Sequence, residues 1–202
     1  MLAIIQARSS SKRFYKKVLF PIKGKPLIYY VISGVKRSTN ITNLVVATSK
    51  NKSDNHLVNY LKKIKVKYFR GDLNNVAKRL VCTAEKYKKK YFLRINGDSP
   101  LIDYKIIDKA LDIFKRSQNK YNLITNVFPR TFPKGQSVEI INTKILKDNL
   151  CKMNKVDLEH VTRYFYKNSS NFFIKNFKSL KKKKFKLSVD TKKDLENILR
   201  YL

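Results

Sequence analysis

Short apolar segments alternate with amphipathic segments along the first two thirds of the chain. Five apolar segments predict buried strands, at residues 2–7, 43–49, 65–71, 90–95 and 121–126. Between them, apolar residues recur at helical spacing and predict helices at residues 26–37, 53–64, 74–87 and 104–117. Because strands alternate with helices, we expect an α/β fold with a mainly parallel sheet covered on both faces.

The last third of the chain is less regular. Residues 135–142 alternate like a strand, residues 157–168 have the pattern of a helix, and residues 185–202 predict a strand that enters a capped helix. The sequence contains no internal repeat and no Pro/Gly-rich linker. We therefore expect a single domain over residues 1–202.

Composition narrows the classes of protein that fit. A hydrophobic content of 43% is enough for a folded core, and the chain has no run of 18 apolar residues and no signal-peptide pattern, so we expect no membrane span. Cys82 and Cys151 have no metal-binding or redox spacing, which favours reduced thiols and a cytoplasmic location. His56 and His160 are the only histidines, which argues against zinc chemistry and a His-based triad.

The net charge of +32 raises the question of a polyanionic partner. The lysines are spread through almost every predicted helix, with the densest run at 181–184, and they accompany abundant Asn and Ile. This composition is typical of proteins from AT-rich genomes. The aromatic residues within 163–177 could stack on bases, but their density favours core or dimer interface. We expect no nucleic-acid partner and keep a non-catalytic, basic nucleic-acid-binding α/β protein as the alternative.

The loop after the first predicted strand is rich in cations and hydroxyls. Arg8, Arg13 and Lys17 surround the serines at 9–11, so the loop offers several donors to a polyphosphate. It does not have the glycine spacing of a Walker A loop. Alternatively, it is a solvated basic loop.

A carboxylate follows another predicted strand. Asp98 stands in Gly-Asp-Ser-Pro at the end of the fourth strand, and Asp190 ends the predicted strand near the C-terminus. Mg²⁺ takes one or two carboxylates and completes its shell with phosphate oxygens and water, so the two aspartates are candidate magnesium ligands. Asp190 could also be the N-cap of the last helix. Since ligands bind at the carboxyl ends of parallel strands, we expect one rim to collect Arg8, Ser49, Arg70 and Asp98.

The motifs resemble those of a known family. The stretch "IIQARSSSKRFYKKVL…GKPLI" is similar to the signature of the cytidylyltransferases that make CMP-activated sugars. The motifs "VVATS", "YFRGDLNNVAKRL", "LRINGDSPLID", "RTFPKGQSVEI", "EHVTRYF" and "VDTKKDL" follow in the order of the spore-coat polysaccharide subgroup, which is similar to CMP-sialic acid and CMP-Kdo synthetases. The resemblance implies a Rossmann-like three-layer α/β/α sandwich with a mixed sheet, of the nucleotide-diphospho-sugar transferase type. It also implies a homodimer, with residues 127–185 forming the acceptor-sugar and dimerisation part.

The resemblance implies a reaction and its partners. CTP and a sugar, expected to be a sugar acid, would give a CMP-sugar and pyrophosphate for surface polysaccharide or glycan synthesis, with Mg²⁺ as cofactor. The sugar hydroxyl would attack the α-phosphorus in line, so alignment and charge neutralisation would supply most of the rate. A pyrophosphorylase that uses another nucleoside triphosphate is the alternative within the same class.

Site roles follow residue by residue from the resemblance. Catalysis would involve Arg8, Lys17 and Asp98. Nucleotide binding would involve Ala7, Arg8, Ser11, Arg13, Lys17, Thr48, Ser49, Arg70, Gly71, Arg79 and Asp98. Sugar binding would involve Arg130, Glu139 and His160, and Mg²⁺ would be held by Asp98 and Asp190. As alternatives, Arg70 or Arg79 could pair with a helix carboxylate, His160 could be a packed helix residue and Glu139 could face solvent.

The sequence departs from the family pattern at a few positions. Tyr15 and Lys16 stand where family members usually have Pro-Gly, and Ser10 stands where Gly is frequent. These changes affect the phosphate loop, because residues other than glycine are strained at positive φ. Asn75 and Ser137 each replace an Asp and affect substrate contacts.

Overall fold

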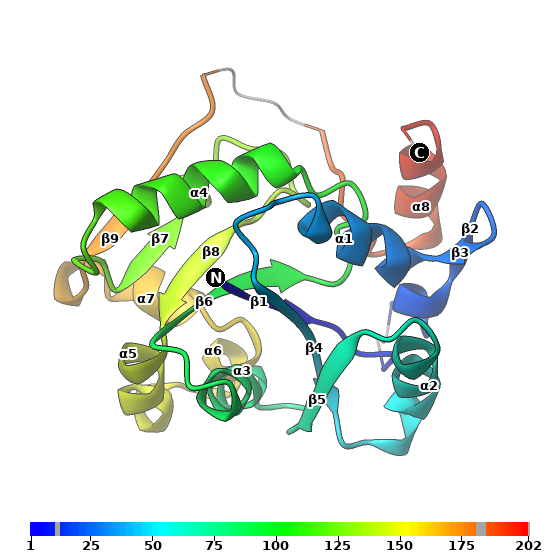
Figure 1. Ribbon diagram of the computed structural model, residues 1–202, viewed down its shortest axis with the longest axis horizontal. Helices are drawn as coiled ribbons and strands as arrows, with labels where there is room; N and C mark the ends of the chain where they lie inside the picture. Colours follow the sequence, from blue (N-terminus) through cyan, green and yellow to red (C-terminus); the bar gives the residue numbers. More distant parts are fainter. Residues whose placement is uncertain (11–12, 181–184, 202) are drawn as a thin grey trace.

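A seven-stranded mixed sheet forms the centre of the molecule (Figure 1). The structure is a computed structural model that describes residues 1–10, 13–180 and 185–201. Ser11, a predicted phosphate-loop residue, and the lysine run at 181–184 lie outside the described residues. In spatial order, the strands are β5 (Lys67–Gly71), β4 (Asn43–Ser49), β1 (Leu2–Gln6), β6 (Tyr91–Asn96), β8 (Glu139–Asn142), β7 (Leu123–Thr125) and β9 (Ile174–Asn176).

The first half of this sheet is parallel. β1 pairs in parallel with both β4 and β6, and β4 pairs in parallel with β5. β8 runs antiparallel to β6 and β7, whereas the edge strand β9 is parallel to β7. A separate hairpin joins β2 (Pro21–Ile22) and β3 (Lys25–Pro26). The predicted mainly parallel, mixed sheet is thus confirmed.

Helices cover both faces of the sheet and enclose two cores. Ala3 and Ile5 of β1 belong to one core and Leu2 and Ile4 to the other, because successive side chains of a strand point to opposite faces. On the first face lie α1 (Leu27–Lys36), α2 (Asn55–Lys63), α4 (Tyr104–Arg116) and α8 (Lys192–Leu199); on the second lie α3 (Val76–Lys86), α5 (Thr143–Asp148), α6 (Lys155–Glu159) and α7 (Arg163–Lys167). Short 3-10 turns are η1 (Lys17–Leu19), η2 (Lys52–Asp54), η3 (Leu150–Lys152) and η4 (Ser169–Asn171).

The four helices predicted in the first two thirds of the chain agree with α1 to α4 within two residues at each end. The helix predicted at 157–168 is wrong as a single element, because it is divided into α6 and α7. The break turns Val161 and Thr162 into the interior, where Thr162 accepts a hydrogen bond from Arg94 (3.3 Å), and leaves His160 exposed. The alternative that His160 is a packed helix residue is therefore wrong.

The strand predicted from residue 185 is also wrong. The described part of this segment has one isolated bridge, between Lys134 and Lys186. Its backbone donates to two different loops: Leu187 N–H to Lys134 O (2.6 Å) and Val189 N–H to Asp98 O (2.9 Å). Because these partners do not form one continuous strand, no ladder develops. The segment nevertheless brings residue 190 beside Asp98.

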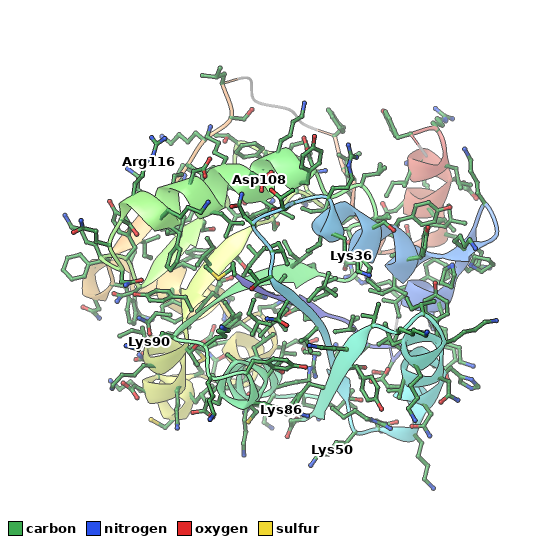
Figure 2. All side chains as sticks on the ribbon, viewed as in Figure 1. Lys36, Lys50, Lys86, Lys90, Asp108 and Arg116 are labelled. Carbon is green, nitrogen blue, oxygen red and sulfur yellow. The ribbon has the colours of Figure 1, made fainter. Side chains whose placement is uncertain are left out.

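Basic side chains extend from elements in many parts of the fold. Figure 2 shows Lys36 on α1, Lys50 after β4, Lys86 on α3 and Lys90 before β6. The positive charge is therefore spread over the protein surface. Among the described residues, no helix has the length and apolar character needed to cross a bilayer.

Candidate active site

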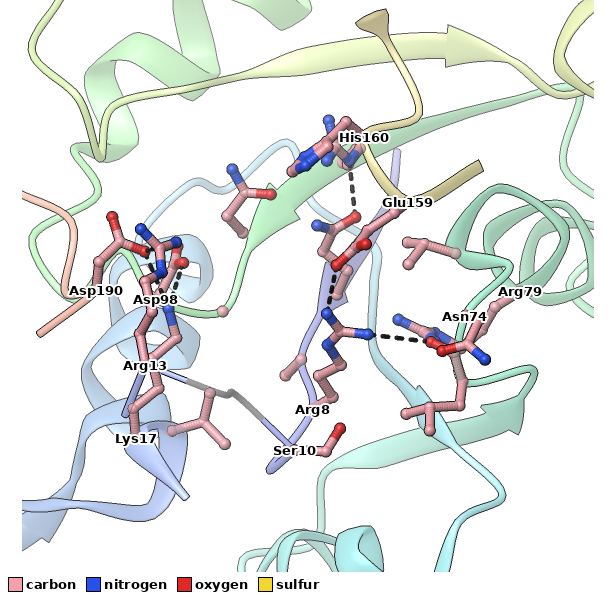
Figure 3. A pocket seen from close by; sticks show the side chains of 18 residues that line it. Arg8, Ser10, Arg13, Lys17, Asn74, Arg79, Asp98, Glu159, His160 and Asp190 are labelled. Carbon is pink, nitrogen blue, oxygen red and sulfur yellow. Dashed lines mark hydrogen bonds and ion pairs between the residues drawn. The ribbon is translucent and has the colours of Figure 1, made fainter. Parts of the chain in front are cut away.

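A polar cleft of about 860 Å³ opens where β1 and β6 end (Figure 3). Its walls come from the loops after these two strands, the start of α3, the end of α6 and the residue two positions before α8. The charged or titratable side chains that line it are Arg8, Arg13, Lys17, Arg79, Arg94, Asp98, Glu159, His160 and Asp190.

A close backbone approach brings the two strand ends together. The Gly97 N–H donates to Gln6 O (2.8 Å), and a Cβ at Gly97 would lie 2.8 Å from both Gln6 O and the Ala7 Cβ. Glycine is needed here because a side chain has no room. Asp98 is thereby placed at the cleft, next to the loop that begins with Ala7 and Arg8.

Lys17 lies between the two predicted metal ligands. Its Nζ donates to Asp98 Oδ2 (2.8 Å) and Val189 O (2.8 Å) and lies 3.5 Å from Asp190 Oδ1. Asp190 is also contacted by Arg13 (3.0 Å) and Lys186 (2.9 Å). Burial of Asp190 opposes ionisation, but the Lys186 hydrogen bond and the Lys17 charge outweigh burial and lower the pKa of this carboxyl.

The Asp98 and Asp190 carboxylates suit a magnesium ion that shares its shell with a substrate. Both contact the same ammonium, so their oxygens converge on one point. Among the described residues, no three His, Cys, Asp or Glu side chains gather as a potential metal site. Two carboxylates with remaining positions for phosphate oxygens and water are the usual arrangement for Mg²⁺. The alternative that Asp190 caps the last helix is wrong: Thr191 is the N-cap and forms a capping box with Asp194.

Two arginines line the opposite side of the cleft. Arg8 forms an ion pair with Glu159 and donates to Leu73 O (3.4 Å). Arg79 donates to the backbone carbonyls of Asp72 and Leu73, and its buried Nε has no hydrogen-bond acceptor in the described structure. Burial and the nearby Arg8 charge lower the pKa of Arg79 to about 10.

The loop after β1, residues 8–17, which is predicted to bind phosphate, is held at both of its described ends. The fully buried Asp54 accepts hydrogen bonds from Ser9 N (2.6 Å), from Ser49 N (3.1 Å) and from the Ser49 hydroxyl. At the other end, Lys16 N donates to Ser9 O (2.8 Å), and Lys16 adopts the left-handed conformation at φ 55°. Lys16 thus takes a conformation that favours glycine, at the position where the family pattern has one.

Four residues predicted for nucleotide binding do not line the cleft. Thr48 and Ser49 are buried at the end of β4, where Asp54 binds Ser49. Arg70 donates to Ser49 O and Asn51 O (both 2.9 Å), and Gly71 pairs with Ser49 in the sheet. These residues lie at the carboxyl ends of their strands, as predicted. However, Ser49 and Arg70 do not line the cleft that contains Arg8 and Asp98.

The alternative that Arg70 or Arg79 pairs with a helix carboxylate is wrong for the described part of the chain. Both Arg70 and Arg79 donate to backbone carbonyls, and no ion pair to a helix carboxylate is seen for either among the described residues. Gly71 leaves room for Arg79, since a Cβ there would lie 2.8 Å from the Arg79 Cγ.

The predicted sugar-binding residues are separated. His160 lines the cleft. Arg130 does not line it and instead donates to the Ser137 hydroxyl (3.2 Å). Glu139 is buried and does not line the cleft, so the alternative that it faces solvent is wrong. It forms an ion pair with Arg94 and accepts a hydrogen bond from the Tyr166 hydroxyl (2.6 Å). Burial and the Glu139 charge raise the pKa of Tyr166.

Some cleft residues were missed by the sequence analysis. Arg94 forms part of the lining and donates to the Gln6 amide oxygen (2.9 Å). Glu159 stands beside His160 in the "EHVTRYF" motif, so its position there was an available signal. Asn74 lies in the loop before α3, where the Asn75 side chain caps the helix by accepting from Lys78 N.

The fold and the charged cleft are typical of α/β enzymes that act on nucleotide phosphates. The sequence matches the family model for cytidylyltransferases over residues 2–201, so the chain belongs to the cytidylyltransferase family, a class of nucleotidyltransferases. The resemblance seen in the motifs is confirmed.

Named relatives match along most of the chain. The spore coat polysaccharide biosynthesis protein SpsF of Bacillus subtilis is 29% identical over 207 residues, which cover 98% of this chain and 84% of the relative. The 3-deoxy-manno-octulosonate cytidylyltransferase of Wigglesworthia glossinidia brevipalpis is 29% identical over 187 residues, which cover 87% and 70%.

Solved structures show the same architecture. A cytidylyltransferase from Leptospira borgpetersenii superposes with a TM-score of 0.93 at 29% identity, covering 100% of this chain and 87% of the other. A CMP:2-keto-3-deoxy-manno-octonic acid synthetase complexed with CTP has a TM-score of 0.76 at 17% identity, covering 99% and 97%. The latter comparison shows a shared fold, and the predicted Rossmann-like architecture is confirmed.

Proposed function

We propose that this protein transfers the CMP group of CTP to a hydroxyl of a sugar acid and releases pyrophosphate, for the synthesis of a surface polysaccharide or glycan. The arrangement around Lys17 is the observation that best supports this proposal. A lysine suited to bind a triphosphate lies against Asp98 and Asp190, the two carboxylates suited to Mg²⁺. Arg8 and Arg79 line the same cleft.

The proposed reaction is an in-line displacement at the α-phosphorus. A sugar oxygen forms a bond to this phosphorus, the bond to the oxygen bridging the α- and β-phosphates breaks, pyrophosphate leaves and the hydroxyl proton passes to solvent. Arg8, Arg13 and Lys17 would align the triphosphate and neutralise its charge, which is the main contribution of a protein to phosphoryl transfer. When bound to Asp98 and Asp190, Mg²⁺ would polarise the α-phosphate and favour ionisation of the attacking hydroxyl.

The acceptor is proposed to lie near Glu159 and His160, with Arg94 behind it. Among the described residues, five arginine or lysine side chains and three carboxylates line the cleft, and this excess of positive charge favours anionic ligands. A sugar acid fits this balance, and one of the relatives is named for its action on 3-deoxy-manno-octulosonate. We also propose a homodimer formed through residues 127–185, where Phe128 and Phe173 are exposed.

Pyrophosphate release tests the proposal. Each of the four ribonucleoside triphosphates is incubated with Mg²⁺ and a panel of eight-carbon and nine-carbon sugar acids and neutral sugars. We expect release from CTP with one sugar acid, lost in Asp98→Ala and retained in Asp112→Ala, a control on the exposed side of α4.

Other outcomes separate the alternatives. Release with a different triphosphate indicates a pyrophosphorylase of other specificity. Salt-sensitive binding of generic DNA or RNA without turnover indicates the nucleic-acid-binding alternative. If the protein shows no pyrophosphate release and CTP does not raise its melting temperature, the transferase proposal is overturned.

A further inference from the structure

The Lys17 ammonium is surrounded by oxygen atoms of the cleft. Its three oxygen neighbours are one carboxylate oxygen each from Asp98 and Asp190 and the Val189 carbonyl, at 2.8, 3.5 and 2.8 Å. The Lys17 side chain is only 11% exposed, so water screens these contacts weakly. Two carboxylates and a carbonyl are also the oxygen ligands that a hard divalent cation uses.

The surrounding charges oppose entry of a free metal ion. Arg13 and Lys186 contact Asp190, so the two carboxylates already contact three cationic groups, Lys17 included. A divalent cation would have to displace the ammonium and remain close to the other two positive groups. Like charges at these distances repel, whereas the positive charge of all three groups attracts a triphosphate.

We propose that Lys17 serves as an internal cation that closes the Asp98–Asp190 pair to free divalent metal until a triphosphate draws the ammonium away. The proposal rests on the proposed function, because a triphosphate is the ligand expected to compete for Lys17. Its phosphate oxygens replace the carboxylates as acceptors for the ammonium, and the vacated carboxylate oxygens become available to the metal that accompanies the nucleotide. Metal and nucleotide then bind cooperatively, and each raises the affinity for the other by the same factor.

A lysine that only binds phosphate predicts a different result. Removing such a lysine weakens CTP binding and leaves metal binding without nucleotide unchanged. If Lys17 also closes the metal site, its removal creates a site for divalent cations in the absence of nucleotide. Lys17→Met tests this gain because methionine keeps an unbranched apolar side chain and lacks the charge.

The experiment measures Mn²⁺ binding without nucleotide, by electron paramagnetic resonance of the free ion. Wild type, Lys17→Met and Lys17→Met/Asp98→Asn are compared with Lys16→Met, which removes the same charge from the adjacent position. We expect Lys17→Met to bind one Mn²⁺ about tenfold or more tightly than wild type, and the double variant and Lys16→Met to show no such gain. Circular dichroism checks folding, and Lys17→Gln replaces Lys17→Met if that variant does not fold.

Each outcome decides the proposal. Binding of Mn²⁺ by wild type as tightly as by the Lys17 variant overturns it, as does a folded Lys17 variant with no gain. Failure of the proposed function is detected separately, as no pyrophosphate release by wild type with any substrate pair, and does not alter the nucleotide-free metal measurement.

Discussion

Arg8 and Glu159, 151 residues apart in the chain, form an ion pair across the cleft (Figure 3). Arg8 belongs to the loop predicted to bind the triphosphate, whereas Glu159 lies beside His160 on the proposed acceptor side. A triphosphate that binds Arg8 must therefore compete with Glu159. This competition lowers the apparent affinity for the nucleotide.

We expect Glu159→Gln to bind CTP more tightly than wild type in calorimetric titrations with Mg²⁺. The two side chains are 30% and 44% exposed, so the pair is screened and its loss should lower the Kd by about two- to fivefold. Glu85→Gln is the control, because Glu85 pairs with Lys147 outside the cleft. Weaker CTP binding in Glu159→Gln would show that Glu159 supports the nucleotide site.

The buried pair of Arg94 and Glu139 predicts a large effect on stability. The two side chains are 8% and 4% exposed, and Glu139→Gln leaves the Arg94 guanidinium without its counterion. Breaking a buried pair from one side costs about 3–5 kcal/mol of unfolding free energy, which urea titration measures. Glu85→Gln again serves as control, with a change expected within about 0.5 kcal/mol. Unchanged stability with loss of sugar use would instead favour the direct sugar contact predicted for Glu139.

The parts of the cleft that sequence could predict lie in loops directly after strands. Arg8 and Asp98 were placed together because the carboxyl ends of parallel strands meet at one edge, which a local pattern is enough to reveal. Lys17 joined them as part of the same loop. All three line the cleft, and their roles in binding and catalysis stay predictions.

Contacts between distant segments could not be predicted in this way. Ser49 follows the same edge rule as Arg8, yet it is buried by Asp54, and this choice depends on how η2 packs against the sheet. Residues 185–189 have the alternation of a strand, but the pattern does not specify a partner, and their backbone bonds to two loops. Glu159 forms its ion pair with Arg8 because the fold places the end of α6 opposite Arg8, and no local sequence pattern specifies this position.

Asp194 predicts a loss of stability in acid. Its Oδ2 accepts from the backbone N–H groups of Asp190 and Thr191 (both 2.9 Å) and pairs with Lys186 (2.6 Å). Burial opposes ionisation of this carboxyl, but the Lys186 hydrogen bond and the two N–H groups outweigh burial and lower its pKa to about 2. Because the pKa is lower in the folded state, the stabilisation is complete above the ordinary value of 3.8 and is lost as the pH falls towards 2.

Melting temperatures of wild type and Asp194→Asn from pH 7 to pH 2 test this assignment. We expect wild type to have the higher melting temperature at neutral pH. The difference in melting temperature should shrink below pH 4, because protonated Asp194 is uncharged, as asparagine is. A difference that stays constant over the whole range would contradict it. Thr191→Ala removes the N-cap and one hydroxyl donor to Asp194 (3.1 Å) but keeps the carboxylate, Lys186 and the two N–H donors. It should lose about 1 kcal/mol at neutral pH and keep most of the acid-dependent part.

Gly135 controls the path of the segment that carries Asp190. It has φ +98°, and a Cβ there would overlap the Leu187 carbonyl carbon and lie 2.6 Å from Ser188 N. Gly135→Ala therefore strains the backbone and also pushes residues 187–189 away from their hydrogen bonds. We expect it to lose more than about 2 kcal/mol of unfolding free energy in urea, and pyrophosphate release with CTP should fall with the displacement of Asp190.

Gly24→Ala separates the two causes, because Gly24 also has positive φ (+75°) but, apart from the adjacent residues, no atom of the described part of the chain lies within 4 Å of the added Cβ. Its loss should stay at about 1–2 kcal/mol, the ordinary cost of a left-handed backbone for a residue with a side chain. Turnover should be retained, since the hairpin of β2 and β3 that contains Gly24 does not line the cleft. Equal losses in the two variants would mean that backbone strain alone determines the effect. A larger loss at Gly135 that is accompanied by reduced turnover would tie the close packing of Gly135 against Leu187 to the position of the Asp190 carboxylate.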